Sequence, residues 1–268
     1  MIRLITTDMD GTLLNSRKEV PADFIPWVGD HPEILTVLAS GRQYYTLLDD
    51  FLEIKDHCVF MAENGAFIVY RDEQIHVDEM ADDTVVRCLK KAYSVDEVYP
   101  ILCGTKSVYY PADLEGIMQP GLVFFHSRKP VTELEDYIVQ DTIIKIAMFV
   151  PGRNADEVLS HFTDLPDDVY AVVTGPEWID IMNRSVNKGN ALKLIQKRFG
   201  ISAEECMGFG DLMNDYEMLK NCRYSFAMEN ACEGIRKIAR FHTASNDEDG
   251  VMRVLRDIER YNGRKERK

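Results

Sequence analysis

Basic residues are scarce in this sequence relative to acidic ones. Its 268 residues include 31 Lys and Arg against 45 Asp and Glu, which gives a formal net charge of -14 at pH 7. Such a charge repels the phosphates of nucleic acids and of anionic membranes, so neither partner is expected. A small anion whose charge is masked by a metal ion fits this composition better. The one basic run, at 263–268, is expected to be a solvated tail.

Long apolar runs and closely paired cysteines are missing as well. The longest apolar runs, such as Ile143 to Val150, have the length of a strand rather than the roughly 20 residues of a membrane span. The six cysteines form no Cys-x-x-Cys pair, and the chain begins without a charged segment followed by an apolar one. Reduced thiols and a cytoplasmic location are therefore expected.

Several common catalytic signatures are also lacking. The sequence contains no Walker loop, no Gly-x-Ser-x-Gly elbow and no His-Glu-x-x-His motif, and Gly208 and Gly210 lack the third glycine of a dinucleotide fingerprint. The six histidines are scattered without the spacing of zinc ligands. Nucleotide-cofactor, serine-hydrolase and zinc chemistry are thus disfavoured.

The apolar pattern predicts an α/β core with a mostly parallel sheet that is interrupted by a long insert. Strands are expected at 2–7, 34–39, 58–62, 98–102, 107–110, 122–126, 143–150, 169–173, 206–209 and 224–227, with a hairpin at 66–77. Helices are expected at 43–54, 82–94, 188–199, 212–221 and 248–261. We assign the core to residues 1–81 and 184–268, and an α+β insert to residues 82–183.

The sharpest chemical signal is Asp8-Met-Asp10, which stands where an apolar strand meets a Gly-containing turn. Ligands bind at the carboxyl ends of strands in open α/β sheets. Two carboxylates at this spacing can hold one Mg²⁺, which prefers oxygen ligands. One of them can then attack phosphorus, while the other exchanges a proton with the leaving group and with water. An ordinary Asp and Gly turn is the alternative interpretation.

Other polar residues follow later strands or open later helices. Ser40 and Gly41 come after the second strand, where a hydroxyl and backbone N–H groups can bind phosphate, although Ser40 is also a normal helix cap. Lys188 opens a helix and can reach a phosphate oxygen, unless it is a surface lysine. Asp211 and Asn214 follow the strand at 206–209, and the predicted helical turn places them on one face. Asp211 can complete a metal site or cap the helix.

In order and spacing, these four elements resemble the four motifs of the haloacid dehalogenase superfamily of phosphatases. Glu63 to Ala66 and Asn246 to Val251 are similar to phrases of its Cof-type branch (class IIB), which carries a C2-type cap between the second and third motifs. The resemblance implies a Rossmann-like core and an inserted α+β cap. It implies that this cap closes over the site and selects the substrate.

The resemblance also implies roles for the individual residues. Asp8 corresponds to the nucleophile, and Asp10 to the general acid and base whose backbone carbonyl also binds Mg²⁺. Asp211 corresponds to the third protein ligand of the metal. The residues that would bind the transferring phosphoryl group are Ser40, Gly41, Lys188 and Asn214.

The expected activity is Mg²⁺-dependent hydrolysis of small phosphate esters, such as sugar phosphates, through an aspartyl-phosphate. One alternative is a phosphomutase of the same superfamily, which passes the phosphoryl group to a sugar hydroxyl instead of water. The other is a non-catalytic phosphate-binding protein, because a fold does not fix its function.

Overall fold

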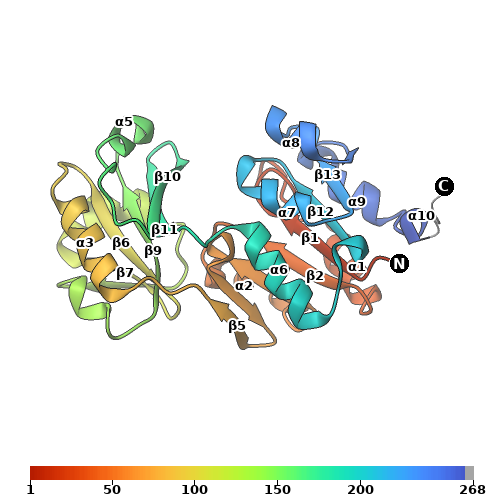
Figure 1. Cartoon of the computed structure of the whole chain (residues 1–268), viewed down its shortest axis with the longest axis horizontal. Helices are drawn as coiled ribbons and strands as arrows, with labels where there is room; N and C mark the ends of the chain where they lie inside the picture. The colour runs from red at the N-terminus through yellow and green to blue at the C-terminus, as the bar shows by residue number, and fades with distance from the viewer. Residues whose placement is uncertain (263–268) are drawn as a thin grey trace. The chain divides into compact units, whose positions relative to one another are not determined.

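The chain forms two compact units in a computed structural model, which describes residues 1–262 (Figure 1). The first unit comprises residues 1–76 and the chain from Asn187 onward, and the second comprises Val77–Val186. The predicted insert at 82–183 falls inside the second unit. The basic run at 263–268, expected to be a solvated tail, lies outside the described residues.

The first unit is built on an eight-stranded sheet in the order β14-β13-β12-β1-β2-β3-β4-β5. Its strands are β1 (Leu4–Asp8), β2 (Leu35–Ala39), β3 (Cys58–Ala62), β4 (Phe67–Tyr70), β5 (Glu73–Val77), β12 (Cys206–Gly210), β13 (Tyr224–Ala227) and β14 (Phe241–His242). The run from β14 to β3 is parallel, and β4 returns antiparallel to β3. Because β12, β1 and β2 are parallel, their carboxyl ends meet at one edge of the sheet.

Helices accompany this sheet. They are α1 (Phe24–Asp30), α2 (Tyr44–Asp50), α6 (Lys188–Phe199), α7 (Tyr216–Lys220), α8 (Glu233–Ile238), α9 (Gly250–Leu255) and α10 (Glu259–Asn262), with 3-10 turns η1 (Leu52–Ile54), η2 (Glu63–Gly65), η5 (Ala203–Glu205), η6 (Met213–Asp215) and η7 (Asn246–Glu248). The helix α6 packs Leu192 and Ile195 into a core cluster with Leu4 and Val59 of the sheet. This packing fixes the start of α6 beside the strands.

The second unit carries a six-stranded sheet in the order β10-β11-β9-β6-β7-β8. Its elements are β6 (Tyr99–Gly104), β7 (Val108–Pro111), β8 (Arg128–Val131), β9 (Ile143–Phe149), β10 (Val169–Gly175), β11 (Trp178–Asn183), α3 (Asp82–Tyr93), α4 (Glu115–Leu122), α5 (Ala155–Leu159), η3 (Ala112–Leu114) and η4 (Glu135–Tyr137). The pairs are antiparallel except for β7 and β8. The α3 and α5 helices share one core cluster with the sheet, and α4 shares another.

The α/β fold is thus confirmed, whereas the predicted strand at 122–126 is wrong. The helix α4 ends there, at Leu122, and the next strand, β8, begins only at Arg128. A short apolar run does not distinguish a strand from a buried helix end. Three of the four β8 residues are exposed, so its sequence carries little apolar signal.

Three predicted helices are also shorter or interrupted. The helix predicted at 43–54 is α2 followed by the 3-10 turn η1, the one predicted at 212–221 is η6 followed by α7, and the one predicted at 248–261 is η7, α9 and α10. Apolar periodicity continues across such 3-10 turns, so it gives the extent of a helical region but not its breaks. Across the described residues, no helix combines the length and apolar character that spanning a bilayer requires.

Candidate active site

Lys188 is fully buried between two carboxylates. It is the first residue of α6, because the side chain of Asn187 caps that helix by accepting a hydrogen bond from the backbone of Asn190 at 2.8 Å. Its Nζ donates to Oδ1 of Asp8 and, at 2.6 Å, to Oδ1 of Asp215. Burial alone would lower the pKa of Lys188, but the two carboxylates raise it above its usual value. Lys188 is therefore a charged interior residue rather than a surface lysine.

Three buried carboxylates meet at the edge where β1 and β12 end. Carboxylate oxygens of Asp8, Asp211 and Asp215 all lie within 4.8 Å of one another. With the single ammonium of Lys188 beside them, the cluster carries two net negative charges when every group is ionised. An oxygen-rich, doubly negative cluster fits a hard divalent cation such as Mg²⁺.

The loop after β12 and the turn after β1 hold these carboxylates in place. Oδ2 of Asp215 accepts hydrogen bonds from the backbone N–H groups of Asp211 at 2.9 Å and Leu212 at 3.2 Å. Thr12 donates its hydroxyl to Oδ1 of Asp211 at 3.1 Å. Gly11 has φ +81°, and a Cβ at this position would collide with the Asp211 carboxylate. A side chain at this turn would thus displace a predicted metal ligand.

Burial disturbs the ionisation of two members of the cluster. It raises the pKa of Asp8 to about 8, an effect that Lys188 reduces and that Asp215 and Asp211 reinforce. Burial, together with the charge of Asp215, also raises the pKa of Asp211 to about 6. Asp8 therefore needs added positive charge to be a carboxylate at neutral pH, whereas Asp211 is mostly ionised there.

A pH-dependent stability follows from these two raised pKa values. At these two groups the folded chain keeps protons that the unfolded chain has already released, so their contribution to the stability of the metal-free protein falls as pH rises from about 4 to about 8. Asp8→Asn removes the larger contribution. The quantity to compare is the free energy of unfolding of Asp8→Asn minus that of wild type, measured with chelator present. We expect this difference to be larger at about pH 8 than at about pH 5, by roughly 2 to 5 kcal/mol.

Urea unfolding of both proteins at the two pH values measures this difference. Adding Mg²⁺ should stabilise wild type, because a ligand of the folded state shifts the equilibrium toward it, and should stabilise Asp8→Asn less. A difference between the two proteins that stays constant with pH would contradict the assignment of the raised pKa to Asp8.

The carboxylate of Asp10 lies outside the acidic cluster and has its own basic partners. Arg42 donates from Nε to Oδ2 at 2.7 Å and from Nη2 to Oδ1 at 2.5 Å, while Lys18 donates to Oδ1 at 2.6 Å. The remaining Nη1 of Arg42 donates to Asp50 of α2 at 3.2 Å. Burial would raise the pKa of Asp10, but the hydrogen bonds from Arg42 and Lys18 hold it below its usual value.

Ser40 belongs to a buried loop and does not cap a helix. The α2 helix begins at Tyr44, after Gln43. The Ser40 hydroxyl accepts a hydrogen bond from the backbone N–H of Arg42 at 3.1 Å, which leaves its own hydrogen available as a donor. The loop that follows β2 is therefore shaped to present Ser40 and Gly41 next to the end of β1.

Asn64 connects the other two predicted phosphate-binding residues. A Cβ on Gly41 would lie 3.1 Å from the Asn64 side-chain nitrogen, so this approach needs a small residue. Asn214 donates its amide to Oδ1 of Asn64 at 3.3 Å. The predicted helical turn shared by Asp211 and Asn214 is wrong, because Asp211 precedes η6 and faces Thr12.

The turn after β1 is fastened by residues from near the end of the described chain. Asn246 donates its side-chain amide to the backbone carbonyl of Leu14 at 2.9 Å. Asp247 accepts from both the backbone N–H and the hydroxyl of Ser16, at 2.7 Å each. The segment that resembles a Cof-type phrase thus holds the loop that carries Asp10.

Sequence reasoning missed three of these contacts. Asp215 is not among the predicted site residues, yet its carboxylate belongs to the acidic cluster. Arg42 follows the predicted phosphate loop directly, so its position was a usable signal. The sequence contains no comparable signal for Lys18, because this residue reaches Asp10 from a loop position with φ +64°.

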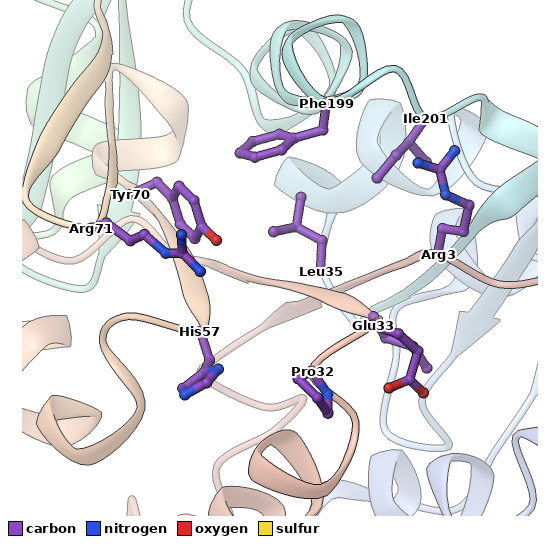
Figure 2. Close-up of a pocket in the computed structure, with 10 residues that line it drawn as sticks. Arg3, Pro32, Glu33, Leu35, His57, Tyr70, Arg71, Phe199 and Ile201 are labelled. Atoms are coloured by element: carbon purple, nitrogen blue, oxygen red, sulfur yellow. The ribbon is translucent and has the colours of Figure 1, made fainter.

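A hollow of about 190 Å³ lies elsewhere on the first unit (Figure 2). Arg3 and Leu35 line it at the amino ends of β1 and β2, opposite the edge that bears Asp8. Tyr70 and Phe199 form part of its wall, with their ring centroids 5.3 Å apart. None of the predicted site residues lines this hollow.

Comparisons with known proteins agree on one family. The model of the haloacid dehalogenase-like hydrolases matches residues 5–255. The chain is 30% identical over 260 residues to the 5-amino-6-(5-phospho-D-ribitylamino)uracil phosphatase YbjI of Escherichia coli, covering 95% of each protein. It is 25% identical to phosphatase YwpJ of Bacillus subtilis, covering 96% of this chain and 100% of that protein. The crystal structure of SMU.1108c from Streptococcus mutans matches with a TM-score of 0.84 and 26% identity, covering 97% and 100% of the two chains.

Proposed function

Since the chain belongs to the haloacid dehalogenase-like hydrolase family and is a phosphatase, we propose that it hydrolyses small phosphorylated metabolites through a phosphoryl group carried on Asp8. The observation that supports this most is the buried set of Asp8, Asp211, Asp215 and Lys188 at one edge of the sheet. A carboxylate placed beside an interior ammonium and other metal-binding carboxylates has the surroundings of a phosphoryl acceptor.

Mg²⁺ is the proposed cofactor, held by the carboxylates of Asp8 and Asp211 and by the backbone carbonyl of Asp10. Asp215 shares the cluster and anchors Lys188. When bound, the ion neutralises charge on the substrate phosphate and on the attacking carboxylate. The donors are all hard oxygens, which suits this ion.

The proposed reaction has two steps, phosphoryl transfer to Asp8 and hydrolysis of the phosphorylated Asp8. Asp8 attacks phosphorus in line, and the P–O bond to the leaving group breaks as the Asp8 oxygen bonds to phosphorus. Lys188 and Asn214, with the hydroxyl of Ser40 and the backbone N–H of Gly41, bind the equatorial oxygens. Their role is positioning and charge stabilisation.

Asp10 is the proposed proton carrier in both steps. In the first, it gives a proton to the leaving oxygen. In the second, it takes a proton from water, which attacks phosphorus and releases inorganic phosphate and free Asp8. The side chain of Asp10 is a candidate for this role because it lies outside the cluster of Asp8, Asp211 and Asp215, where Arg42 and Lys18 bind its carboxylate oxygens.

The second unit, Val77–Val186, is proposed to be the substrate-selecting cap, with sugar phosphates or similar esters as substrates. Exchanging it for the cap of a relative should change which esters are used while dependence on Asp8 remains. Unchanged preference after the exchange would remove this assignment.

Phosphate release from a panel of esters tests the proposed function. The panel contains para-nitrophenyl phosphate, sugar phosphates and 5-amino-6-(5-phospho-D-ribitylamino)uracil, the compound in the name of the E. coli relative. Each is assayed with Mg²⁺ and with chelator. Release that requires Mg²⁺ supports the proposal, whereas ester consumption without release of inorganic phosphate would favour a phosphomutase.

A further inference from the structure

Arg42 makes a two-point contact with Asp10 that the mechanism above does not use. Its Nε and Nη2 each meet a different oxygen of the Asp10 carboxylate, at 2.7 and 2.5 Å. A guanidinium that binds both oxygens fixes the plane of a carboxylate as well as its position. The carboxylate of Asp10 therefore has one defined orientation.

Arg42 is itself held from several directions, through its backbone and through its side chain. Its backbone N–H donates to the Ser40 hydroxyl at 3.1 Å, and its backbone carbonyl accepts from the N–H of Glu63 at 3.1 Å. Its Nη1 donates to Asp50 at 3.2 Å. Only 22% of the Arg42 side chain is exposed, against 60% for Lys18. Arg42 is thus a rigid support for Asp10, whereas Lys18 is an exposed one.

We infer that Arg42 is a positioning residue, which holds the Asp10 carboxylate in the orientation that proton transfer requires. The inference rests on the proposed function, because the contact between Arg42 and Asp10 has this role only if Asp10 transfers protons. Arg42 also belongs to the loop that carries Ser40 and Gly41. The same loop thereby supports both the proposed phosphate contacts and the proposed proton carrier.

The Arg42→Met variant tests this inference, since it keeps much of the side-chain length and removes every donor. On an alkyl phosphate, whose leaving group needs a proton, we expect kcat to fall about 10- to 100-fold, because a small misplacement of a catalytic group has this cost. KM should stay within about 2-fold, because Arg42 is not assigned a contact with substrate. A rise in KM with unchanged kcat would overturn the inference.

A double-mutant cycle with Asp10→Asn separates action through Asp10 from direct contact with the substrate. In the Asp10→Asn background, Arg42→Met should lower kcat by less than about 3-fold further, because the group that it positions is already lost. An equal loss in both backgrounds would assign Arg42 to the substrate and refute the positioning role. Full activity of Asp10→Asn itself would instead remove the proposed role of Asp10.

Two further variants complete the test. Arg42→Lys keeps the charge but cannot bind both carboxylate oxygens of Asp10, so we expect its kcat to be at least about 5-fold below that of wild type. This variant keeps the inference testable if Arg42→Met folds poorly. Wild-type activity of Arg42→Lys would show that charge alone suffices and would overturn the inference. Arg71→Met, at an exposed arginine that lines the hollow of Figure 2, is the matched control and should leave kcat unchanged.

Discussion

Replacing Asp8 with Asn is expected to lower kcat for phosphate release by about 10⁴-fold or more, because the attacking carboxylate is lost while the rest of the site remains. The amide is nearly isosteric with the carboxylate and can still lie beside Lys188. Loss of activity should therefore occur in a folded protein. Acid quenching of wild type during turnover should trap a phosphoryl group on Asp8, and the variant should show none.

Two controls sharpen this result. Asp8→Glu restores the carboxylate but adds a methylene in a site where the wild-type side chain is already buried, so it should remain inactive. Asp30→Asn, at the exposed end of α1, should keep wild-type activity. A trapped phosphoryl group on any other residue would show that Asp8 is not the nucleophile.

Replacing Lys188 with Met is expected to impair both stability and catalysis. It leaves the carboxylates of Asp8 and Asp215 buried without their shared cation, which should lower the free energy of unfolding by about 3 to 5 kcal/mol at about pH 8 without metal. The loss should shrink at about pH 5, where Asp8 holds a proton. With Mg²⁺, kcat should fall about 10²- to 10³-fold, since the proposed contact to the phosphoryl oxygens is lost.

A second substitution distinguishes charge from packing in this result. Adding Asp215→Asn to Lys188→Met removes one of the two buried carboxylates that lack a cationic partner in Lys188→Met. The double variant should therefore recover part of the stability without recovering activity. Lys193→Met, at an exposed position of the same helix, should change the free energy of unfolding by less than about 0.5 kcal/mol. A Lys188→Met loss that does not depend on pH would indicate lost packing rather than unpaired charge.

Much of the fold could be predicted from the sequence because the core strands are short, apolar and separated by helical patterns. The strands predicted at 2–7 and 206–209 are β1 and β12, and the helix predicted at 188–199 is α6. The two strands are fully buried and the helix buries one face, so their apolar patterns are strong. The failure at 122–126 concerns a short apolar run at the end of α4, and the strand that forms after it, β8, lies at an exposed edge, where burial no longer dictates residue type.

The site could be predicted only as far as each residue follows a strand or opens a helix. Asp8, Asp211 and Lys188 do so, and the structure brings them together. The partners of Asp10 could not be derived, because Lys18 and Arg42 reach it by side-chain length and loop geometry. Such contacts depend on tertiary structure, which no local pattern encodes.

The central position of β1 in its sheet has a consequence for the order in which a newly made chain acquires activity. Leu4 pairs with Leu35 on one side and with Cys206 on the other, so one neighbour of the first strand is synthesised some two hundred residues after it. Residues 77–186 are contiguous and form a unit that can fold while the ribosome is still adding the remainder. Asp8, the proposed nucleophile, is thus synthesised long before the other members of its cluster, and no nascent fragment ending before Asp215 carries the complete proposed site.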